Sequence, residues 1–330
     1  EGNPFFIEEM LKSLITTGEI IYNDGKWERK SHEAGSLQGI SLPNSSHLPR
    51  SVQLAVQQRL DHLSVEARDV LSFAAVAGRR FDFALLQHLT GRNEAELVRL
   101  VKELIVAQLV VEESEDVLAF RHALTRQAVY SDLLARERRA LHRSVARTME
   151  HIYADALDAH LGDLAYHFYM AGEWAKVLEY AQHAGEKAQA LYAPRAAIEQ
   201  YTHALEAVER LAMAPMPGLY RVRGQCYELL GDFSAAREDY TRALEVAQAT
   251  HDANMEWQSL FDLGYLWTGL DYAQAGDYLQ RALALARTMN DPLMLARTLN
   301  RMGNWHMNLE EPLEGPVSYT HLTLPTILRV

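Results

Sequence analysis

The residues of this sequence that are suited to chemistry are few, and most lack the neighbours that chemistry requires. Cys226 is the single cysteine, so the chain can form neither an intrachain disulfide nor a cysteine-based metal cluster. His160 and His167 fall on roughly one face of a predicted helix. No third ligand with suitable spacing accompanies them, which favours packing or surface histidines over a metal site. The Gly-Lys pair at 25–26 is followed by tryptophan, so no phosphate-binding loop ending in Gly-Lys-Ser or Gly-Lys-Thr is present. We therefore assign no catalytic residue and no metal ligand.

The segment 2–10 reads Gly-Asn-Pro-Phe-Phe-Ile-Glu-Glu-Met. It resembles a segment of the STAND signalling ATPases, which include the LuxR-type large ATP-binding regulators and their cyclase- or kinase-linked relatives. In that superfamily the segment opens a helix of the nucleotide-binding lid. The resemblance implies that Pro4 contacts the adenine of ATP or ADP and that Gly2 lets the backbone approach the base closely. The alternative is that Pro4 is the first-turn proline of an ordinary amphipathic helix over residues 4–17.

A second motif, Phe-Arg-His-Ala-Leu-Thr-Arg-Gln-Ala-Val-Tyr over residues 120–130, resembles a segment of the same regulators. It also parallels the Met-His-Asp motif of the related NB-ARC switch proteins, in which the histidine reaches the β-phosphate of ADP. The resemblance implies that His122 donates a ring N–H to a phosphate oxygen, a charge-assisted bond if the imidazole is protonated. Ala123 stands where the NB-ARC motif has Asp. Any contact that the Asp side chain makes in the ADP-bound state of those proteins therefore has no matching residue here. The alternative is that His122 caps or satisfies a nearby backbone group.

The segment 48–63, between the two motifs, is also similar to these proteins, so the resemblance covers the chain to about residue 150. It implies the end of a nucleotide-binding module at 1–45 and a winged-helix domain at 46–150. The phosphate-binding loop and the acidic magnesium-binding strand would then lie upstream in a longer parent protein. The chain begins at Glu1 without methionine, which is consistent with such a missing portion.

Local signals predict the elements that position these residues. Asn-Asp-Gly at 23–25 predicts the turn of a hairpin within 18–27, and a Ser-, Gly-, Asn- and Pro-rich stretch at 31–46 predicts a linker. Ser64 can cap a helix over residues 65–77 that Gly78 ends.

The next helix follows Asn93, which forms a plausible reciprocal cap with Glu96. Apolar runs at 109–111 and 117–120 on either side of the acidic turn 112–116 predict two strands that form a wing. Helices followed by such a hairpin are typical of a winged helix.

Beyond about residue 153 the pattern is helical and repeats. Tyr201, Tyr240 and Leu279 each begin an x-x-x-Ala-Leu pattern, and they recur every 39 residues (240 − 201 = 39; 279 − 240 = 39). A repeat of this length predicts stacked helix pairs of the tetratricopeptide type over 151–315, because one pair alone cannot bury its apolar face. Residues 316–330 break the pattern with two prolines and several threonines, which predicts a disordered or non-native tail.

Composition limits the partners. The 330 residues carry a formal net charge of −12, which argues against broad binding to nucleic acid or anionic membrane. No apolar run is long enough to span a bilayer, and we expect a cytoplasmic protein. Five arginines cluster on a predicted helix after the wing, which can indicate DNA binding but more simply a solvated face: Arg136, Arg138, Arg139, Arg143 and Arg147.

Together these observations predict a mainly α chain in which lid helices and a winged helix precede a helical solenoid. The favoured function is a bacterial ATP/ADP-switched regulator in which the repeats sense a protein or small-molecule effector. Self-association is possible in such a regulator, and DNA would be bound by an output domain outside this chain. The alternatives are a repeat scaffold that binds a peptide or protein, and a winged-helix DNA-binding regulator. Five aromatic residues are candidate anchors on the concave face of the repeats, although most such residues belong to the core: Tyr227, Trp257, Tyr265, Trp267 and Trp305.

Overall fold

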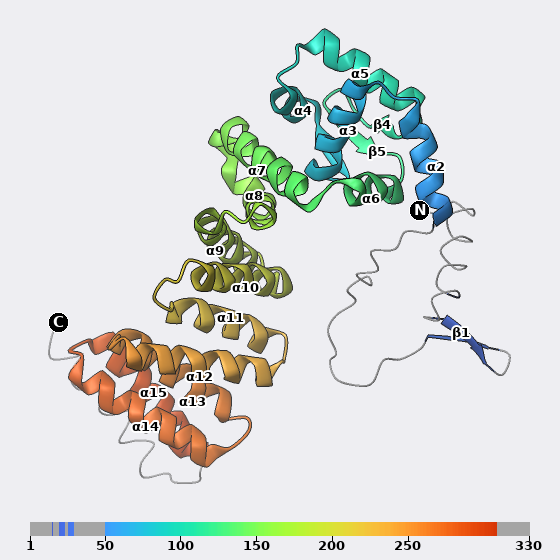
Figure 1. The fold of residues 1–330 in the computed structure, drawn as a ribbon. Coiled ribbons are helices and arrows are strands. Elements are labelled where there is room, and N and C mark those ends of the chain that lie inside the picture. The colour runs from blue at the N-terminus through green and yellow to red at the C-terminus, as the bar shows by residue number, and fades with distance from the viewer. Residues whose placement is uncertain (1–14, 16–19, 24–25, 30–49, 309–330) are drawn as a thin grey trace. The chain divides into compact units, whose positions relative to one another are not determined.

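The computed structural model describes residue 15 and residues 20–23, 26–29 and 50–308 (Figure 1). Its described part is built mainly of helices, and it divides within helix α8 (Leu157–Ala171) into two compact units. The first unit ends at His160 and the second begins at Leu161, while Met170–Gly172 group with the first. The prediction of a mainly α chain with stacked helix pairs is confirmed.

The first unit combines helices with a three-stranded antiparallel sheet in the order β3-β5-β4. Strand β5 lies in the middle, where Phe81 faces Leu118 on one side and Val110 faces Phe120 on the other. The elements are α2 (Arg50–Asp61), α3 (Val65–Ala77), β3 (Arg80–Asp82), α4 (Phe83–Thr90), α5 (Glu94–Val106), β4 (Val110–Glu112), β5 (Val117–Phe120), α6 (Ala123–Asp132), α7 (Ala135–Ile152) and the short helix η1 (Ala154–Ala156).

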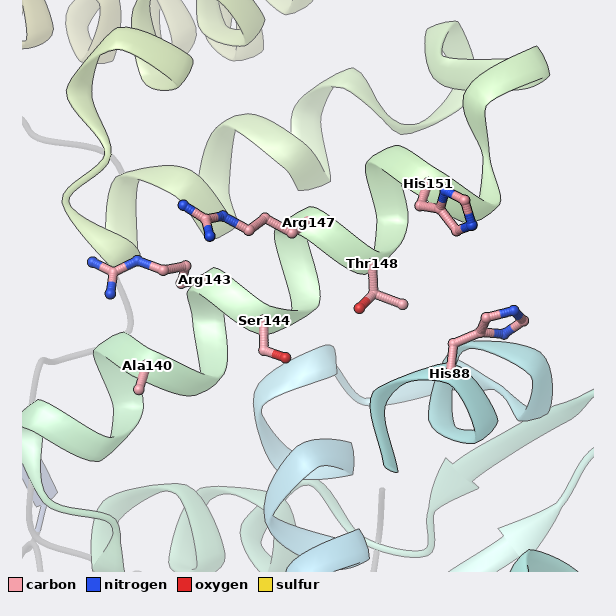
Figure 2. Close-up of a pocket in the computed structure, with 7 residues that line it drawn as sticks. All are labelled: His88, Ala140, Arg143, Ser144, Arg147, Thr148 and His151. Carbon is pink, nitrogen blue, oxygen red and sulfur yellow. The ribbon is translucent and has the colours of Figure 1, made fainter. Parts of the chain in front are cut away.

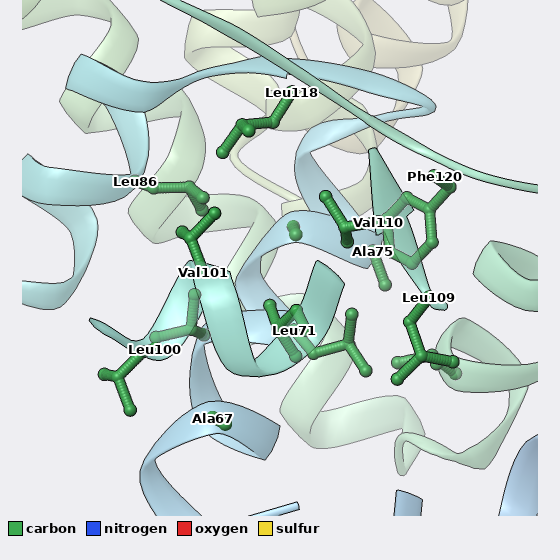
Figure 3. Close-up of a cluster of buried hydrophobic side chains, with 14 of the residues drawn as sticks. Ala67, Leu71, Ala75, Leu86, Leu100, Val101, Leu109, Val110, Leu118 and Phe120 are labelled. Carbon is green, nitrogen blue, oxygen red and sulfur yellow. The ribbon is translucent and has the colours of Figure 1, made fainter. Parts of the chain in front are cut away.

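One apolar core holds this unit together (Figure 3). The buried face of α3 contributes Ala67, Leu71 and Ala75, which meet Leu100 of α5 and Phe120 of β5. The spacing of the α3 residues is that of one face of an α-helix. Because helix and sheet each bury one apolar face in the same cluster, their mutual orientation is fixed by packing.

The ends of α3 and α5 follow the sequence signals, with one correction. Ser64 accepts a hydrogen bond from the Ala67 amide, and Gly78 ends α3 as predicted. Asn93 accepts from the amide of Glu96, but the Glu96 carboxylate pairs with Arg92 rather than returning to Asn93. The predicted reciprocal cap is therefore wrong in its second half, because a guanidinium one helical turn away competes for that carboxylate.

The second unit is a series of helix pairs: α9 (Trp174–Ala190) with α10 (Pro194–Arg210), α11 (Pro217–Leu229) with α12 (Phe233–Ala249), α13 (Ala253–Trp267) with α14 (Tyr272–Thr288), and then α15 (Pro292–Asn308). Asp232 caps α12 and Asp271 caps α14, so each of these second helices begins at an N-cap directly after the turn.

The 39-residue repeat corresponds to one packing contact made in successive pairs. The rings of Tyr201 and Tyr240 lie against Gly185 and Gly224 of the partner helices, so close that an added Cβ would stand 2.6 and 2.7 Å from them. Leu279 takes the same place against an equivalent glycine of α13. The predicted stacking of helix pairs is thus confirmed, and glycine is required because it alone lets the ring reach the backbone.

A separate hairpin, β1 (Ile20–Asn23) and β2 (Lys26–Arg29), pairs Asn23 with Lys26 as predicted. The linker at 31–46 and the tail at 316–330 lie outside the described residues. Among the helices that the structure describes, none has the length and apolar character needed to cross a membrane.

Candidate functional site

The structure places only one of the three predicted nucleotide-binding residues. Gly2 and Pro4 lie outside the described residues. His122 is the N-cap residue of α6, directly after the central strand β5, and its side chain does not make the capping hydrogen bond. The alternative of a side-chain cap is therefore wrong for His122.

The surroundings of His122 are positively charged. Partial burial lowers the pKa of its imidazole, and the charges of Arg121 and Arg59 lower it further. Arg59 comes from α2, where its guanidinium donates to the Gln108 carbonyl at 3.3 Å. Two cations beside a half-buried imidazole at a helix N-terminus form an environment that favours an anion.

In the second unit, polar and aromatic side chains link the first helix of each pair to the first helix of the next. Gln189 of α9 lies 3.4 Å from Gln225 of α11. Arg221 of α11 pairs with Asp262 of α13, with Nε and Oδ2 2.5 Å apart. Burial raises the pKa of the Asp262 carboxyl even though the Arg221 guanidinium opposes that shift.

The link from α13 to α15 is a cation–π stack. The guanidinium of Arg301 lies 4.1 Å from the ring centroid of Tyr265, which is 45% exposed. Arg301 and Arg297 also lie over the ring of Phe261, each at 5.8 Å. We call a set of five exposed or partly buried residues along α11, α13 and α15 the repeat face: Arg221, Phe261, Tyr265, Arg297 and Arg301.

The five predicted aromatic anchors have different positions. Trp257 is buried and donates from Nε1 to the Thr298 hydroxyl at 2.9 Å, and Trp305 donates to the Tyr272 carbonyl. Both belong to the core, as do the half-buried Tyr227 and Trp267, which pack against it. Of the five, Tyr265 is the exposed one.

A third feature is a pocket of about 490 Å³ in the first unit, between α4 and α7. Figure 2 shows Ser144 and Thr148 on neighbouring turns of α7, with His151 near the end of that helix and His88 of α4 opposite it. Arg143, Arg147 and Ala140 complete the lining.

Of these pocket residues, the sequence pattern singles out only Arg143 and Arg147, as members of the arginine cluster. The spacing of the α7 residues places them on one helical face, which was a usable signal. The fact that His88 joins them depends on the packing of α4 against α7.

The remaining candidates have structural roles. His160 stacks on Tyr153 with ring centroids 3.9 Å apart, and His167 is buried. Among the described residues, no group of three or more His, Cys, Asp or Glu could hold a metal ion. Cys226 is buried, and burial raises the pKa of its thiol, as expected for a small packed residue.

Comparison with known proteins gives distant likenesses. No family model matches the chain. Among solved structures, the chain is 12% identical to a STAND protein with a tetratricopeptide repeat sensor from Pyrococcus horikoshii, with a TM-score of 0.39, covering 83% of this chain and 48% of that one. It is 18% identical to BtubC from P. vanneervenii, with a TM-score of 0.40 over 75% of this chain and 93% of that one.

The third solved structure is aspartyl phosphate phosphatase F from Bacillus subtilis, 12% identical, with a TM-score of 0.44 over 88% of this chain and 76% of that one. A curated uncharacterised protein of Rhizobium meliloti (strain 1021) is 24% identical over 309 residues, which are 88% of this chain and 28% of that protein. The chain is thus similar to a part of a much longer protein, less than a third of its length.

Proposed function

We propose that the second unit is a protein-binding scaffold whose repeat face takes an acidic segment of a partner. The observation that carries this proposal is the stack of Arg301 on the exposed ring of Tyr265, at 4.1 Å. A guanidinium held over a ring can still donate its N–H groups to a carboxylate, and the order imposed by the ring contact lowers the entropy lost on binding.

The local charge supports an acidic partner. Helix α15 carries Arg297 and Arg301 but no Asp or Glu, while Asp262 pairs with Arg221 and also interacts electrostatically with Arg297. One carboxylate thus faces the three arginines of the repeat face. This surface is therefore cationic in a chain whose formal net charge is −12. Opposite charge on a partner would steer its approach and exclude segments of the wrong sign.

The test is peptide selection against the full chain, followed by affinity measurements on variants. We expect selection from a random peptide library to enrich Asp- and Glu-rich sequences. Arg301→Ala should then weaken binding by about tenfold, the typical effect of losing one charge-assisted hydrogen bond. Tyr265→Ala should weaken it as well, because it removes the support of the guanidinium.

Arg281→Ala is the matched control. Arg281 also lies over a tyrosine ring, that of Tyr278 at 5.5 Å, but both residues stand on α14, a second helix of its pair. Its replacement should leave affinity unchanged. Equal losses in Arg281→Ala and Arg301→Ala, or enrichment of peptides without acidic residues, would rule out this surface.

A second candidate is nucleotide-dependent regulation through the first unit. It rests on His122 with Arg121 and Arg59 at the start of α6. The order of helices and strands from α3 to β5, with a β4–β5 hairpin after α5, supports the assignment of a winged helix. In this proposal the chain is part of a STAND-type ATPase, and His122 contacts a phosphate of ADP bound mainly by an upstream module.

This second proposal is tested in an intact parent protein that contains the upstream module. His122→Ala should shorten the retention of ADP or raise the basal output, while His62→Ala, an exposed histidine after α2, should change neither. If ADP retention and output are the same in His122→Ala as in the wild type, His122 has no part in nucleotide binding.

A further inference from the structure

The pocket between α4 and α7 is lined by side chains that donate hydrogen bonds or carry positive charge. Of its seven lining residues, only Ala140 lacks a polar side chain, and none carries a carboxylate. The two hydroxyls and the two imidazoles can all donate to oxygen, while the side chains of Arg143 and Arg147 extend away from the two hydroxyls (Figure 2) and contribute positive charge nearby. A site with this composition favours a ligand that presents several acceptor oxygens and negative charge.

The hydroxyls and imidazoles come together from two helices. Ser144 and Thr148 lie one turn apart on α7, so their side chains point to the same side of the helix. His88 of α4 faces this region across the pocket (Figure 2). Its Nδ1 lies 2.9 Å from the Ala84 carbonyl oxygen, so this nitrogen donates to the backbone and Nε2 is left for a ligand. In the imidazolium form Nε2 donates to an anionic oxygen.

The charge near the pocket is positive and therefore also favours an anionic ligand. Arg143 and Arg147 stand on α7, which carries five arginines and only two carboxylates, Glu137 and Glu150. A carboxylate ligand has only two oxygens, which is fewer than the donors gathered here.

We propose that the α4–α7 pocket binds the phosphate group of a small phosphorylated molecule. Its volume of about 490 Å³ lies in the range of about 300–1,000 Å³ that is typical of small-molecule sites. A concave site with four uncharged or titratable donors suits a compact phosphate better than a continuous nucleic-acid backbone. The residues differ from those of the repeat face and from His122, so this proposal does not depend on either function proposed above.

The experiment follows the histidine side chains of the full chain by NMR after selective labelling of histidine. The resonances of His88 and His151 are assigned with His88→Gln and His151→Gln. Inorganic phosphate and a nucleoside monophosphate are titrated as small probes, and a short DNA duplex is titrated separately. We expect both small probes to shift the two assigned resonances in a saturable way, because the phosphate group enters between these rings.

Variants then connect the shifts to the pocket. The double substitution Ser144→Ala/Thr148→Ala should weaken the binding of both small probes by about tenfold, since it removes two neutral donors. Arg139→Gln is the control for a general effect of the positive charge of α7, because Arg139 is exposed on the same helix and does not line the pocket. It should leave the affinity within about twofold of the wild type, as expected for a screened surface charge.

Three results would overturn the proposal. One is the absence of a saturable shift of His88 and His151 with either small probe. Another is an equal loss of affinity in Arg139→Gln and in the double variant, which would indicate a diffuse charge effect. The third is a response to the DNA duplex alone, which would assign the surface to nucleic acid. Unchanged thermal unfolding of the variants shows that they are folded, since the substituted side chains are at most partly buried.

Discussion

The ring of Tyr240 occupies the space beside Gly224 in which the Cβ of any other residue would stand, at 2.7 Å from Cε1 of the ring. Tyr240 is 1% exposed, and its hydroxyl donates to Glu228 at 2.7 Å. The ring is therefore held at both its face and its tip. This contact fixes how closely α11 and α12 approach, and it recurs with Gly185 and Tyr201 one repeat earlier.

Gly224→Ala should destabilise the second unit, because the methyl group and the Tyr240 ring cannot occupy the same space. Overpacking of this kind costs about 1–3 kcal/mol, more than the helix propensity that alanine adds. Thermal unfolding gives the size of the effect, and hydrogen exchange places it in α11 and α12. Gly218→Ala is the control on the same helix, since its Cβ would meet nothing within 4 Å; it should be neutral or slightly stabilising. In a Tyr240→Ala background the cost of Gly224→Ala should disappear, and a cost that persists there would contradict the steric explanation.

Asp239→Ala should be among the most damaging single substitutions on α12. Arg223 donates to both oxygens of Asp239, at 2.8 and 2.7 Å, and the Asp239 side chain is only 7% exposed. Removal of the carboxylate leaves a largely buried guanidinium without compensation, at a cost of about 3–5 kcal/mol. The double variant Arg223→Met/Asp239→Leu should lose less, because no buried charge remains unpaired.

The control for that pair is Asp277→Ala on α14. Asp277 forms an exposed ion pair with Arg281 at 3.6 Å, and such pairs contribute about 0–1 kcal/mol. Urea unfolding of the wild type and the three variants measures the differences. If Asp239→Ala and Asp277→Ala have the same midpoint, burial does not determine the strength of this interaction.

His142 should make the stability of the first unit depend on pH. Its imidazole is buried and lies 2.9 Å from the Tyr130 hydroxyl, and burial, with smaller contributions from Arg126 and Arg138, lowers its pKa to about 4. The unfolded chain binds this proton near the ordinary histidine pKa of about 6.5. Because the native pKa is the lower one, the contribution of His142 is complete above about pH 6.5 and is lost as pH falls toward about 4.

The measurement is the unfolding temperature of the first unit between pH 4 and 7, in the wild type and in His142→Gln. We expect the wild type to lose stability faster on acidification, since glutamine takes up no proton. The hydrogen bond to Tyr130 is available to both side chains, which limits other differences. Parallel curves for the two proteins would show that His142 is not the group responsible.

Ser64→Ala should weaken the start of α3 by about 1–2 kcal/mol, the usual cost of losing an N-cap. The Ser64 hydroxyl accepts from the Ala67 amide at 3.2 Å and donates to the Glu103 carboxylate at 2.9 Å, so it ties α3 to α5 as well. Ser72→Ala on the same helix is the control, because the Ser72 hydroxyl only donates to the Arg68 carbonyl one turn back. Chemical denaturation measures the free energy of unfolding of both variants. Equal decreases in the two variants would show that the N-cap of Ser64 does not account for the effect.

Contacts between residues far apart in the sequence are not predicted by its local patterns. Strand β3 was not predicted, because Arg80–Asp82 is too short to show an alternating pattern and exists as a strand through its pairing with β5. The aromatic residues show the same limit. Trp257 and Tyr265 both lie on α13, yet the first is covered by α15 through Thr298 and the second is exposed. Composition cannot distinguish them, because the neighbouring helix determines which face is covered.

The sequence by itself determined the features that depend on nearby residues: the cap at Ser64, the helix end at Gly78, and the repeat marked by Tyr201 and Tyr240. Backbone amides at a helix start must be satisfied by residues within one turn, and a repeated packing contact leaves its period in the chain. The tertiary structure alone decided that His88 and Ser144 line one pocket and that Arg301 lies over Tyr265. Those contacts depend on the angle and distance at which separate helices pack, and that geometry is set by the buried cores as a whole.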